Sequence, residues 1–443
     1  MMPPKKGLRE FFHHQNSLGR IFRNAGWMLA GKGAGAILSL FYLAAATRGL
    51  GPVQFGQFAL ILSLGQAISG FVSFQTWRIV IRFGSKHVVE NQRLAFSRLA
   101  IACICLDCIA AIGGCVLAAV GVKLLGPYFG WTPALTTNAL LYAFFVLLSV
   151  RSTAVGILRA YDKFRGGAAA DAAMPVTRLI GALVVVAVGP TVTLFLAAWA
   201  LSEVTTAIAY WWLVIRHRLI VVEEDSLKNL ASVPGEQENF WKFVMLTNLG
   251  STVSSLQQQL PVLASGLFAG PAAAGLFRFS SQLSQALARI GDMLARSMFA
   301  EFSRVRAKDG AGEAWTLLRG STRLSIWGGI IILALVIIAG KPALYIISGQ
   351  AYLPAYPLLV MLGVAAAIDL ATVGFEPALM ASGHAGQALA IRLISLIILA
   401  TMLWISLPVM QERGAGLSMI AASFSNALLF MLATFRSNAL RKL

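Results

Sequence analysis

Long apolar stretches alternate with short polar segments along the whole chain. Long apolar runs such as 326–340, and 101–122 with Asp107 as its one charged residue, lack the two-residue alternation of a membrane β-strand and are typical of membrane-spanning helices. This pattern predicts twelve spans, at residues 22–47, 56–82, 99–122, 137–158, 168–189, 191–216, 243–268, 273–300, 316–340, 355–380, 385–410 and 415–437. We therefore expect an all-α polytopic membrane protein.

The composition agrees with a membrane protein and excludes a soluble one. Of the 443 residues, 58% are apolar and only 12% are charged, whereas a soluble domain has about 25% charged residues. Helices of about 20 residues each leave no room for a catalytic ectodomain. The four cysteines, Cys103, Cys105, Cys108 and Cys115, lie in a single apolar run, which favours buried thiols over a disulfide or a metal site.

The longest segment between predicted spans, residues 217–242, divides the chain into two parts. Residues 1–216 form an N-terminal lobe with an interfacial arm and spans one to six, and residues 243–443 form a C-terminal lobe with spans seven to twelve. The motif Gly-Pro-x-x-x-Gly-x-Phe begins at Gly51 and recurs at Gly270, at the first hairpin of each part. The repeat predicts two six-helix lobes of the same orientation, joined by a cytoplasmic linker at 217–242.

Basic residues are distributed very unequally between the two sides of the predicted membrane. Of the 36 Lys and Arg residues, six lie within spans, 26 lie on the side of both termini, and four, Arg48, Lys123, Lys341 and Arg413, lie on the opposite side. The positive-inside rule predicts cytoplasmic termini. The net charge of +18 is therefore explained by topology, and we expect no nucleic-acid partner.

Charged residues deep inside spans are costly and normally face a cavity or a partner. Lys32, Arg151 and Arg178 all fall near the predicted midplane of the N-terminal lobe. Facing one cavity, they suit a diphosphate headgroup. The alternative is that either arginine forms a structural ion pair with Glu203 or Asp107.

Intramembrane carboxylates are candidates for coupling transport to H⁺ or Na⁺. These are Asp107, Glu203, Asp369 and Glu376. Asp369 and Glu376 are seven residues apart and are expected on one face of a continuous helix. The competing interpretations are a salt bridge from Asp107 to an arginine and simple solvation of Glu376.

Amides within span seven provide a further candidate site. Gln257, Gln258 and Gln259 are consecutive and cannot share one helix face, so at least one of them is expected to point into the lumen. Gln257 and Gln258 are the candidates to bind sugar hydroxyls, the alternative being that these amides hydrogen-bond neighbouring helices. No histidine cluster or Walker A lysine is present in the sequence, so we expect no metal ion, no cofactor and no enzymatic activity.

Several motifs resemble the polysaccharide-transport branch, the Wzx-like oligosaccharide flippases, of the multidrug/oligosaccharidyl-lipid/polysaccharide flippase superfamily. The motifs are Thr47-Arg48-Gly49-Leu50-Gly51-Pro52-Val53-Gln54-Phe55-Gly56, Trp77-Arg78 with Arg82, Ser348-Gly349-Gln350-Ala351-Tyr352-Leu353-Pro354-Ala355, and Ala381-Ser382-Gly383-His384. Their order and spacing cover nearly the whole chain.

The resemblance implies a fold like that of multidrug exporters of the same superfamily, with two lobes that alternate between inward- and outward-facing states. It implies a polyprenyl-pyrophosphate-linked oligosaccharide as substrate, first met by Arg82, and the bacterial inner membrane as location. Expected partners are the lipid bilayer, a polysaccharide polymerase and a chain-length regulator. The alternative is an ion-coupled exporter of small molecules, for which an acidic cavity is expected. A membrane-embedded transferase is disfavoured because no loop is long enough to carry a catalytic cluster.

Overall fold

The computed structural model describes residues 6–223, 230–307 and 311–436, and side chains at 35, 37–223, 230, 232–285, 318–320 and 322–436. This part of the chain is helical and contains no β-strand. The helices are α1 (Lys6–Val72), α2 (Thr76–Val89), α3 (Arg93–Leu125), α4 (Pro133–Leu148), α5 (Ser152–Ala160), α6 (Phe164–Val188), α7 (Val192–Arg216), η1 (Leu230–Ser232), α9 (Val233–Glu236), α10 (Phe240–Ala307), α11 (Ala311–Ser348), η2 (Gln350–Ala355), α12 (Tyr356–Ala371), α13 (Phe375–Ala381), α14 (Ala385–Met410) and α15 (Glu412–Arg436).

Helices α1 and α10 each contain a sharp reversal at the repeated glycine. Gly51 has φ 69° and Gly270 has φ 84°, values that glycine adopts without the steric strain of a Cβ atom. Proline follows each glycine and fits the start of the new helix, where no backbone N–H is required.

Ten stretches of the described chain are long and apolar enough to cross a membrane. Two of them, Ile37–Val89 and Phe240–Gln285, contain the reversals at Gly51 and Gly270 and so hold two crossings each. The described helices therefore provide the twelve predicted crossings, and the chain is a polytopic all-α membrane protein.

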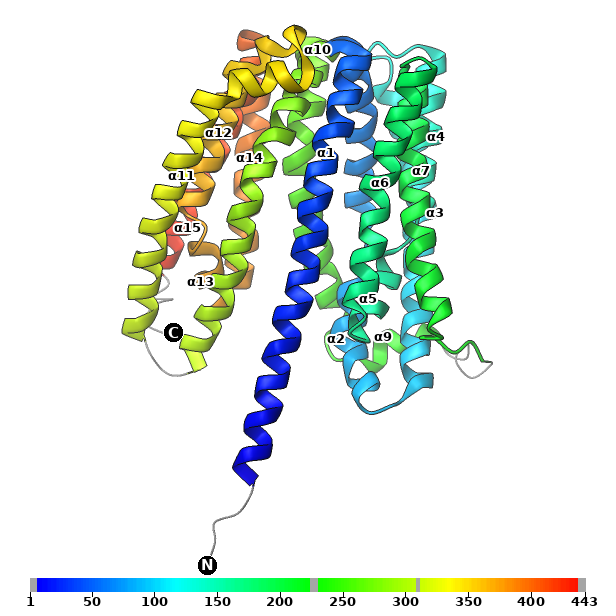
Figure 1. Ribbon diagram of the computed structural model, residues 1–443, viewed down its shortest axis with the longest axis vertical. Helices are drawn as coiled ribbons and strands as arrows, with labels where there is room; N and C mark the ends of the chain where they lie inside the picture. The colour runs from blue at the N-terminus through cyan, green and yellow to red at the C-terminus, as the bar shows by residue number, and fades with distance from the viewer. Residues whose placement is uncertain (1–5, 224–229, 308–310, 437–443) are drawn as a thin grey trace, which may run out of the picture.

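The helices form two groups (Figure 1). α1 packs against α3, α4, α6 and α7, while α10 packs against α11, α12, α14 and α15. α1 and α10 also form the most extensive contact between the groups. The groups meet at the end of the molecule where α1 and α10 reverse, opposite the chain termini, and the ribbons diverge towards the end that carries the termini (Figure 1). We call these the hairpin end and the terminal end.

Three predicted spans are broken helices, which the apolar pattern did not indicate. The breaks lie at 73–75, 149–151 and 372–374. The prediction that Asp369 and Glu376 share one continuous helix face is therefore wrong, because Asp369 belongs to α12 and Glu376 to α13. Pro377 accounts for this third break, since it lacks the N–H group that would bond to the carbonyl of Val373.

The segment between the two groups is partly ordered against the N-terminal helices. Arg98 of α3 forms an ion pair with Glu236 of α9, and the backbone N–H of Val221 donates to the Ser97 hydroxyl. Phe83 of α2 packs against Phe240 with 5.6 Å between ring centroids. The chain thus enters α10 while still in contact with the N-terminal helices.

Candidate functional site: an arginine-rich centre

Two arginines of the N-terminal helices share one buried carboxylate. Arg151 Nη1 lies 2.7 Å from Glu203 Oε2, and Arg178 Nη2 lies 2.8 Å from Glu203 Oε1. The side chain of Glu203 is only 10% exposed, whereas that of Arg151 is 30% exposed. Of the two sequence-based alternatives, Glu203 is the partner of both arginines and Asp107 of neither.

Three separate helices position this triad. Arg151 stands in the break before α5, Arg178 is on α6 and Glu203 is on α7. Arg178 Nε also donates to the Ser202 hydroxyl at 3.0 Å, and its guanidinium lies 5.4 Å from the ring centroid of Trp199. The Arg178 guanidinium is therefore held in one orientation by a carboxylate, a hydroxyl and an aromatic face.

A third arginine, Arg278 of α10, brings the C-terminal helices into the centre. Its residue surface is 9% exposed, and its Nη atoms donate to Gln259 Oε1 at 3.2 Å and, across the two groups of helices, to Gln66 Oε1 at 3.4 Å. Its Nε has no hydrogen-bond partner among the described residues, and no described carboxylate forms an ion pair with it. Arg278 is thus a buried cation held only by neutral amides, which is energetically costly and typical of a functional position.

Tyr142 of α4 lies near both Arg278 and the triad. Its ring packs against Gly65 of α1, and it lies within electrostatic range of Arg278, Arg178, Arg151 and Glu203. Its hydroxyl is buried without a hydrogen-bond partner among the described residues. We call these five residues, Arg151, Arg178, Arg278, Glu203 and Tyr142, the arginine-rich centre. It contains three guanidinium groups, one carboxylate and one phenol without a hydrogen-bond partner among the described residues, and its formal charge is positive.

Sequence reasoning did not select Arg278 or Gln259 as site residues. Gln257 donates instead to the Arg392 carbonyl, and Gln258 is exposed. Since three consecutive residues of a helix point in different directions, only the fold shows that Gln259 is the amide that contacts Arg278. The feature of the sequence that could have identified Arg278 as a site residue is that it is a cation within a predicted membrane span.

Two other residues were predicted to bind substrate, Lys32 and Arg82. The side chain of Lys32, on α1, lies outside the described side chains. Arg82 is exposed on α2, with its guanidinium 4.5 Å from the ring centroid of Phe243, towards the terminal end.

Asp107 of α3 joins two broken helices instead of pairing with a cation. Both of its carboxylate oxygens accept from the Thr76 hydroxyl at 2.9 Å, and Oδ2 also accepts from the backbone N–H and the hydroxyl of Thr153 at 3.1 and 2.7 Å. Thr76 and Thr153 lie in the first turns of α2 and α5. Helix N-termini favour a negative charge, so one carboxylate holds two helix starts together.

Asp369 and Glu376 have different surroundings. Glu376 forms an ion pair of 2.7 Å with Arg392 of α14. Asp369 accepts a hydrogen bond from the Ser423 hydroxyl at 3.0 Å and is exposed, although it lies well inside a candidate membrane span. A carboxylate at that depth normally faces the interior of the helix bundle or a water-filled cavity.

Backbone-to-backbone packing closes the hairpin end between the two groups of helices. A Cβ on Gly275 would lie 2.6 Å from the Pro52 carbonyl oxygen and 3.0 Å from the Gly56 nitrogen. Nearby, the buried ring of Tyr352 lies between Phe55 of α1 and Phe279 of α10, with centroid distances of 6.1 and 5.1 Å.

Polar contacts also join α1 to α11 at the hairpin end. Arg48 donates from Nε to the Ile347 carbonyl at 3.0 Å and from Nη2 to the Ile346 carbonyl, both in the last turn of α11. The hydroxyls of Thr47 and Ser348 lie 2.7 Å apart beside it. A cation at a helix C-terminus satisfies carbonyl groups that have no partner within the helix.

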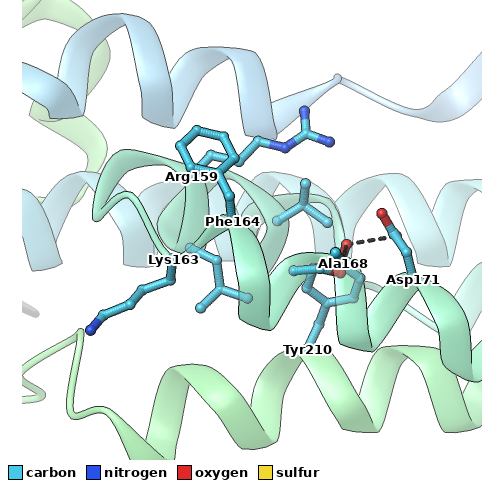
Figure 2. A pocket seen from close by; sticks show the side chains of 9 residues that line it. Arg159, Lys163, Phe164, Ala168, Asp171 and Tyr210 are labelled. Atoms are coloured by element: carbon cyan, nitrogen blue, oxygen red, sulfur yellow. Dashed lines mark hydrogen bonds between the residues drawn. The ribbon is translucent and has the colours of Figure 1, made fainter. Parts of the chain in front are cut away.

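A small hollow near the terminal end lies between α5, α6 and α7. Figure 2 shows Tyr210, whose hydroxyl donates to Asp171 at 2.6 Å, with Arg159 and Lys163 nearby. Its cavity volume is about 20 Å³, which is room for about one water molecule. It is too small to hold a lipid-linked substrate.

Taken together, twelve membrane helices in two groups and a cation-rich centre define a membrane transport protein. The chain belongs to the polysaccharide biosynthesis protein family, whose model matches residues 21–303. It is 29% identical over 344 residues to inner membrane protein YghQ of Escherichia coli strain K12, covering 76% of this chain and 95% of that protein.

The fold is that of the flippase superfamily named above. The chain is similar to the lipid II flippase MurJ in an inward closed conformation, with a TM-score of 0.72 and 11% identity over 94% of this chain and 89% of that one. It is also similar to an inward-facing multidrug resistance MATE family transporter, with a TM-score of 0.70 and 14% sequence identity. This match covers 91% of this chain and 96% of the transporter chain. The family and these structures confirm the predicted fold, and the names of the two structural neighbours are those of a flippase and a transporter, not of enzymes.

Proposed function

We propose that the protein is a flippase for a polyprenyl-diphosphate-linked oligosaccharide, acting in the assembly of a cell-surface polysaccharide such as O-antigen, exopolysaccharide or capsule. The observation that carries the proposal is the positive centre: Arg151 and Arg178 share one carboxylate, Glu203, and Arg278 lies near Arg178 with no carboxylate partner among the described residues. A diphosphate supplies the negative charge that this centre lacks, and guanidinium groups bind phosphate oxygens in pairs. An exporter of cationic compounds would need the opposite balance of charge.

The proposed transport cycle starts from the state described above. The hairpin end is closed by Gly56, Gly275 and Tyr352, and the two similar structures are described as inward closed and inward-facing. With the termini in the cytoplasm of a bacterial inner membrane, as the distribution of basic residues favours, the substrate enters from the terminal end. The centre binds the diphosphate, and opening of the hairpin end releases it to the other leaflet, where a polymerase and a chain-length regulator act on the glycan.

Asp369 is the carboxylate best suited to ion coupling. Asp107 is fully occupied with two helix starts, Glu203 is shared by two arginines, and Glu376 is paired with Arg392. Asp369 has only a hydroxyl partner among the described residues and is exposed. A carboxylate that is both accessible and unpaired is free to take up H⁺ or Na⁺ during the cycle.

Genetics tests the substrate class. Deletion of the gene is expected to remove one cell-surface polysaccharide, detected by electrophoresis of extracted glycans, and the normal gene is expected to restore it. Unchanged polysaccharides together with increased sensitivity to cationic compounds would instead identify a small-molecule exporter.

Variants test the centre within the same strain. Arg178→Ala and Arg278→Ala are expected to abolish polysaccharide export while the protein stays at its normal level in the membrane. Arg216→Ala, which removes an exposed arginine at the end of α7, is the matched control and is expected to export normally. Loss of the protein itself in the Arg178 variant would show that the ion pair is structural.

A further inference from the structure

A second, larger hollow lies at the hairpin end and belongs to the C-terminal helices alone. Its volume is about 600 Å³, a size that accommodates a ligand headgroup. The lining residues come from α11, η2, α12 and α15: Lys341, Gln350, Leu353, Pro354, Tyr356, Pro357, Leu358, Glu412 and Arg413. It is separate from the arginine-rich centre.

This hollow contains two basic residues on the side of the membrane where basic residues are rare. Only four basic residues are assigned to that side, and two of them, Lys341 and Arg413, line this one hollow. Both are exposed, and neither forms an ion pair within the described part of the chain. Glu412 is the one acidic residue among the lining side chains, so the hollow keeps a positive charge.

Helix geometry adds to this positive character. α12 begins at Tyr356 and α15 begins at Glu412, so two helices of 16 and 25 residues start at the hollow. The N-terminal N–H groups of α15 favour an anion, in addition to the two cations, whereas at α12 the Tyr356 N–H donates to the Leu353 carbonyl and Pro357 has no N–H. Tyr356 is fixed in the wall, since its hydroxyl donates to the Ile337 carbonyl at 2.8 Å.

The hollow borders on strongly exposed apolar side chains. Ile338 and Tyr345, 75% and 59% exposed, lie three residues before and four residues after Lys341 and therefore share its face of α11. Val409, 81% exposed, lies just before Glu412. These side chains suit contact with lipid chains, so the hollow sits where the apolar band of the membrane meets the headgroups.

We propose that this hollow binds the phosphate headgroup of an anionic lipid in the leaflet opposite the chain termini, with the lipid chains lying over Ile338 and Val409. The ligand is a lipid and not a soluble phosphate because the cations and the exposed apolar side chains adjoin each other. This site is independent of the proposed transport function, since none of its residues contacts the arginine-rich centre.

Lipid retention by the purified full-length protein tests the site. The protein is prepared in detergent micelles with phosphatidylglycerol or phosphatidylcholine, and bound lipid is counted by native mass spectrometry. We expect retention of phosphatidylglycerol over phosphatidylcholine. The K341Q/R413Q protein should bind phosphatidylglycerol about 30-fold more weakly, since each basic residue near a membrane surface contributes about fivefold.

Matched variants separate this site from general charge effects. Lys341→Gln should weaken binding, whereas Lys123→Gln, which removes an exposed lysine at the same end outside the hollow, should not. The charge-preserving K341R/R413K protein should retain lipid, and size-exclusion chromatography checks that each variant is folded. Equal retention by the Lys341 and Lys123 variants would overturn the proposal. Displacement of the lipid by millimolar inorganic pyrophosphate would overturn the assignment to a lipid.

Discussion

Gly56 of α1 and Gly275 of α10 lie against each other at equivalent positions of the internal repeat, 219 residues apart in the chain. A Cβ on Gly275 would lie 3.1 Å from the Cα of Gly56. The same two motifs that reverse each helical hairpin therefore also bring the backbones of the two groups of helices into close contact. This relationship explains why glycine occurs at both places: a side chain at either would force the backbones apart.

Gly275→Ala should destabilise the closed hairpin end. The added methyl group meets the Pro52 carbonyl oxygen at 2.6 Å, and a backbone atom cannot move aside as a flexible side chain can. Overpacking of this kind costs about 1–3 kcal/mol. Thermal unfolding in detergent should show a lower midpoint for this variant. Gly113→Ala is the control, because a Cβ there meets open space and should not lower stability. Equal midpoints for the two variants would contradict the close approach.

Glu203→Gln should cost more stability than Arg151→Gln. The first change leaves two guanidinium groups without their shared carboxylate, and breaking a buried pair costs about 3–5 kcal/mol. The second change leaves the Arg178–Glu203 pair intact. Thermal unfolding of the two purified proteins gives the comparison, and a greater loss in the Arg151 variant would show that Glu203 is not the central member.

Asp107→Ala should loosen the starts of α2 and α5. The change removes the acceptor of the Thr76 hydroxyl and of the Thr153 N–H, each costing about 1–3 kcal/mol when left unpaired in the interior. Hydrogen exchange should therefore increase at 152–160. Asp107→Asn keeps one acceptor oxygen and should have a smaller effect, while Cys108→Ala, on the exposed side of α3, should have none. Unchanged exchange in the alanine variant would rule out this role.

Arg48→Ala should increase opening of the hairpin end. The variant loses both hydrogen bonds to the last turn of α11, each worth about 0.5–1.5 kcal/mol. A cysteine substituted for the buried Ser348 in a cysteine-free protein reports the opening through its rate of alkylation. The rate should rise with Arg48→Ala and remain the same with Lys123→Ala. A similar increase in both would show that Arg48 does not hold this end closed.

Docking of the 230–236 segment on α3 should depend on pH. The Ser232 hydroxyl and then Arg98 lower the pKa of the Glu236 carboxyl from its ordinary value. A lowered pKa means that the contribution to docking is complete above the unfolded pKa of about 4.3 and is lost as the pH falls through the lower folded value. Limited proteolysis of the segment should be constant from neutral pH to about 4.3 and increase below it. Glu236→Gln should abolish that increase, and its persistence would assign the pH effect to another group.

The sequence by itself determined the crossings, the hairpin turns and the class of fold. An apolar run of about 20 residues is long enough to cross the membrane, and a Gly-Pro pair favours a turn between helices, so both can be recognised without knowledge of neighbours. The intramembrane charges were also visible, because a charged residue within an apolar run can be recognised from the sequence. The role of each site residue remains a prediction.

The tertiary structure decided where helices break and which charges meet. The breaks at 73–75 and 149–151 contain neither Gly nor Pro, and their freed carbonyls are satisfied from other helices: Asn248 donates to the Ser73 carbonyl and Trp211 to the Val150 carbonyl. No local pattern encodes such contacts. Likewise, the choice of Glu203 over Asp107 as the partner of the arginines, and of Gln259 as a partner of Arg278, depends on how α5, α6, α7 and α10 pack. Hydrogen bonds and ion pairs act over a few ångströms, and only the fold brings residues distant in sequence within that range.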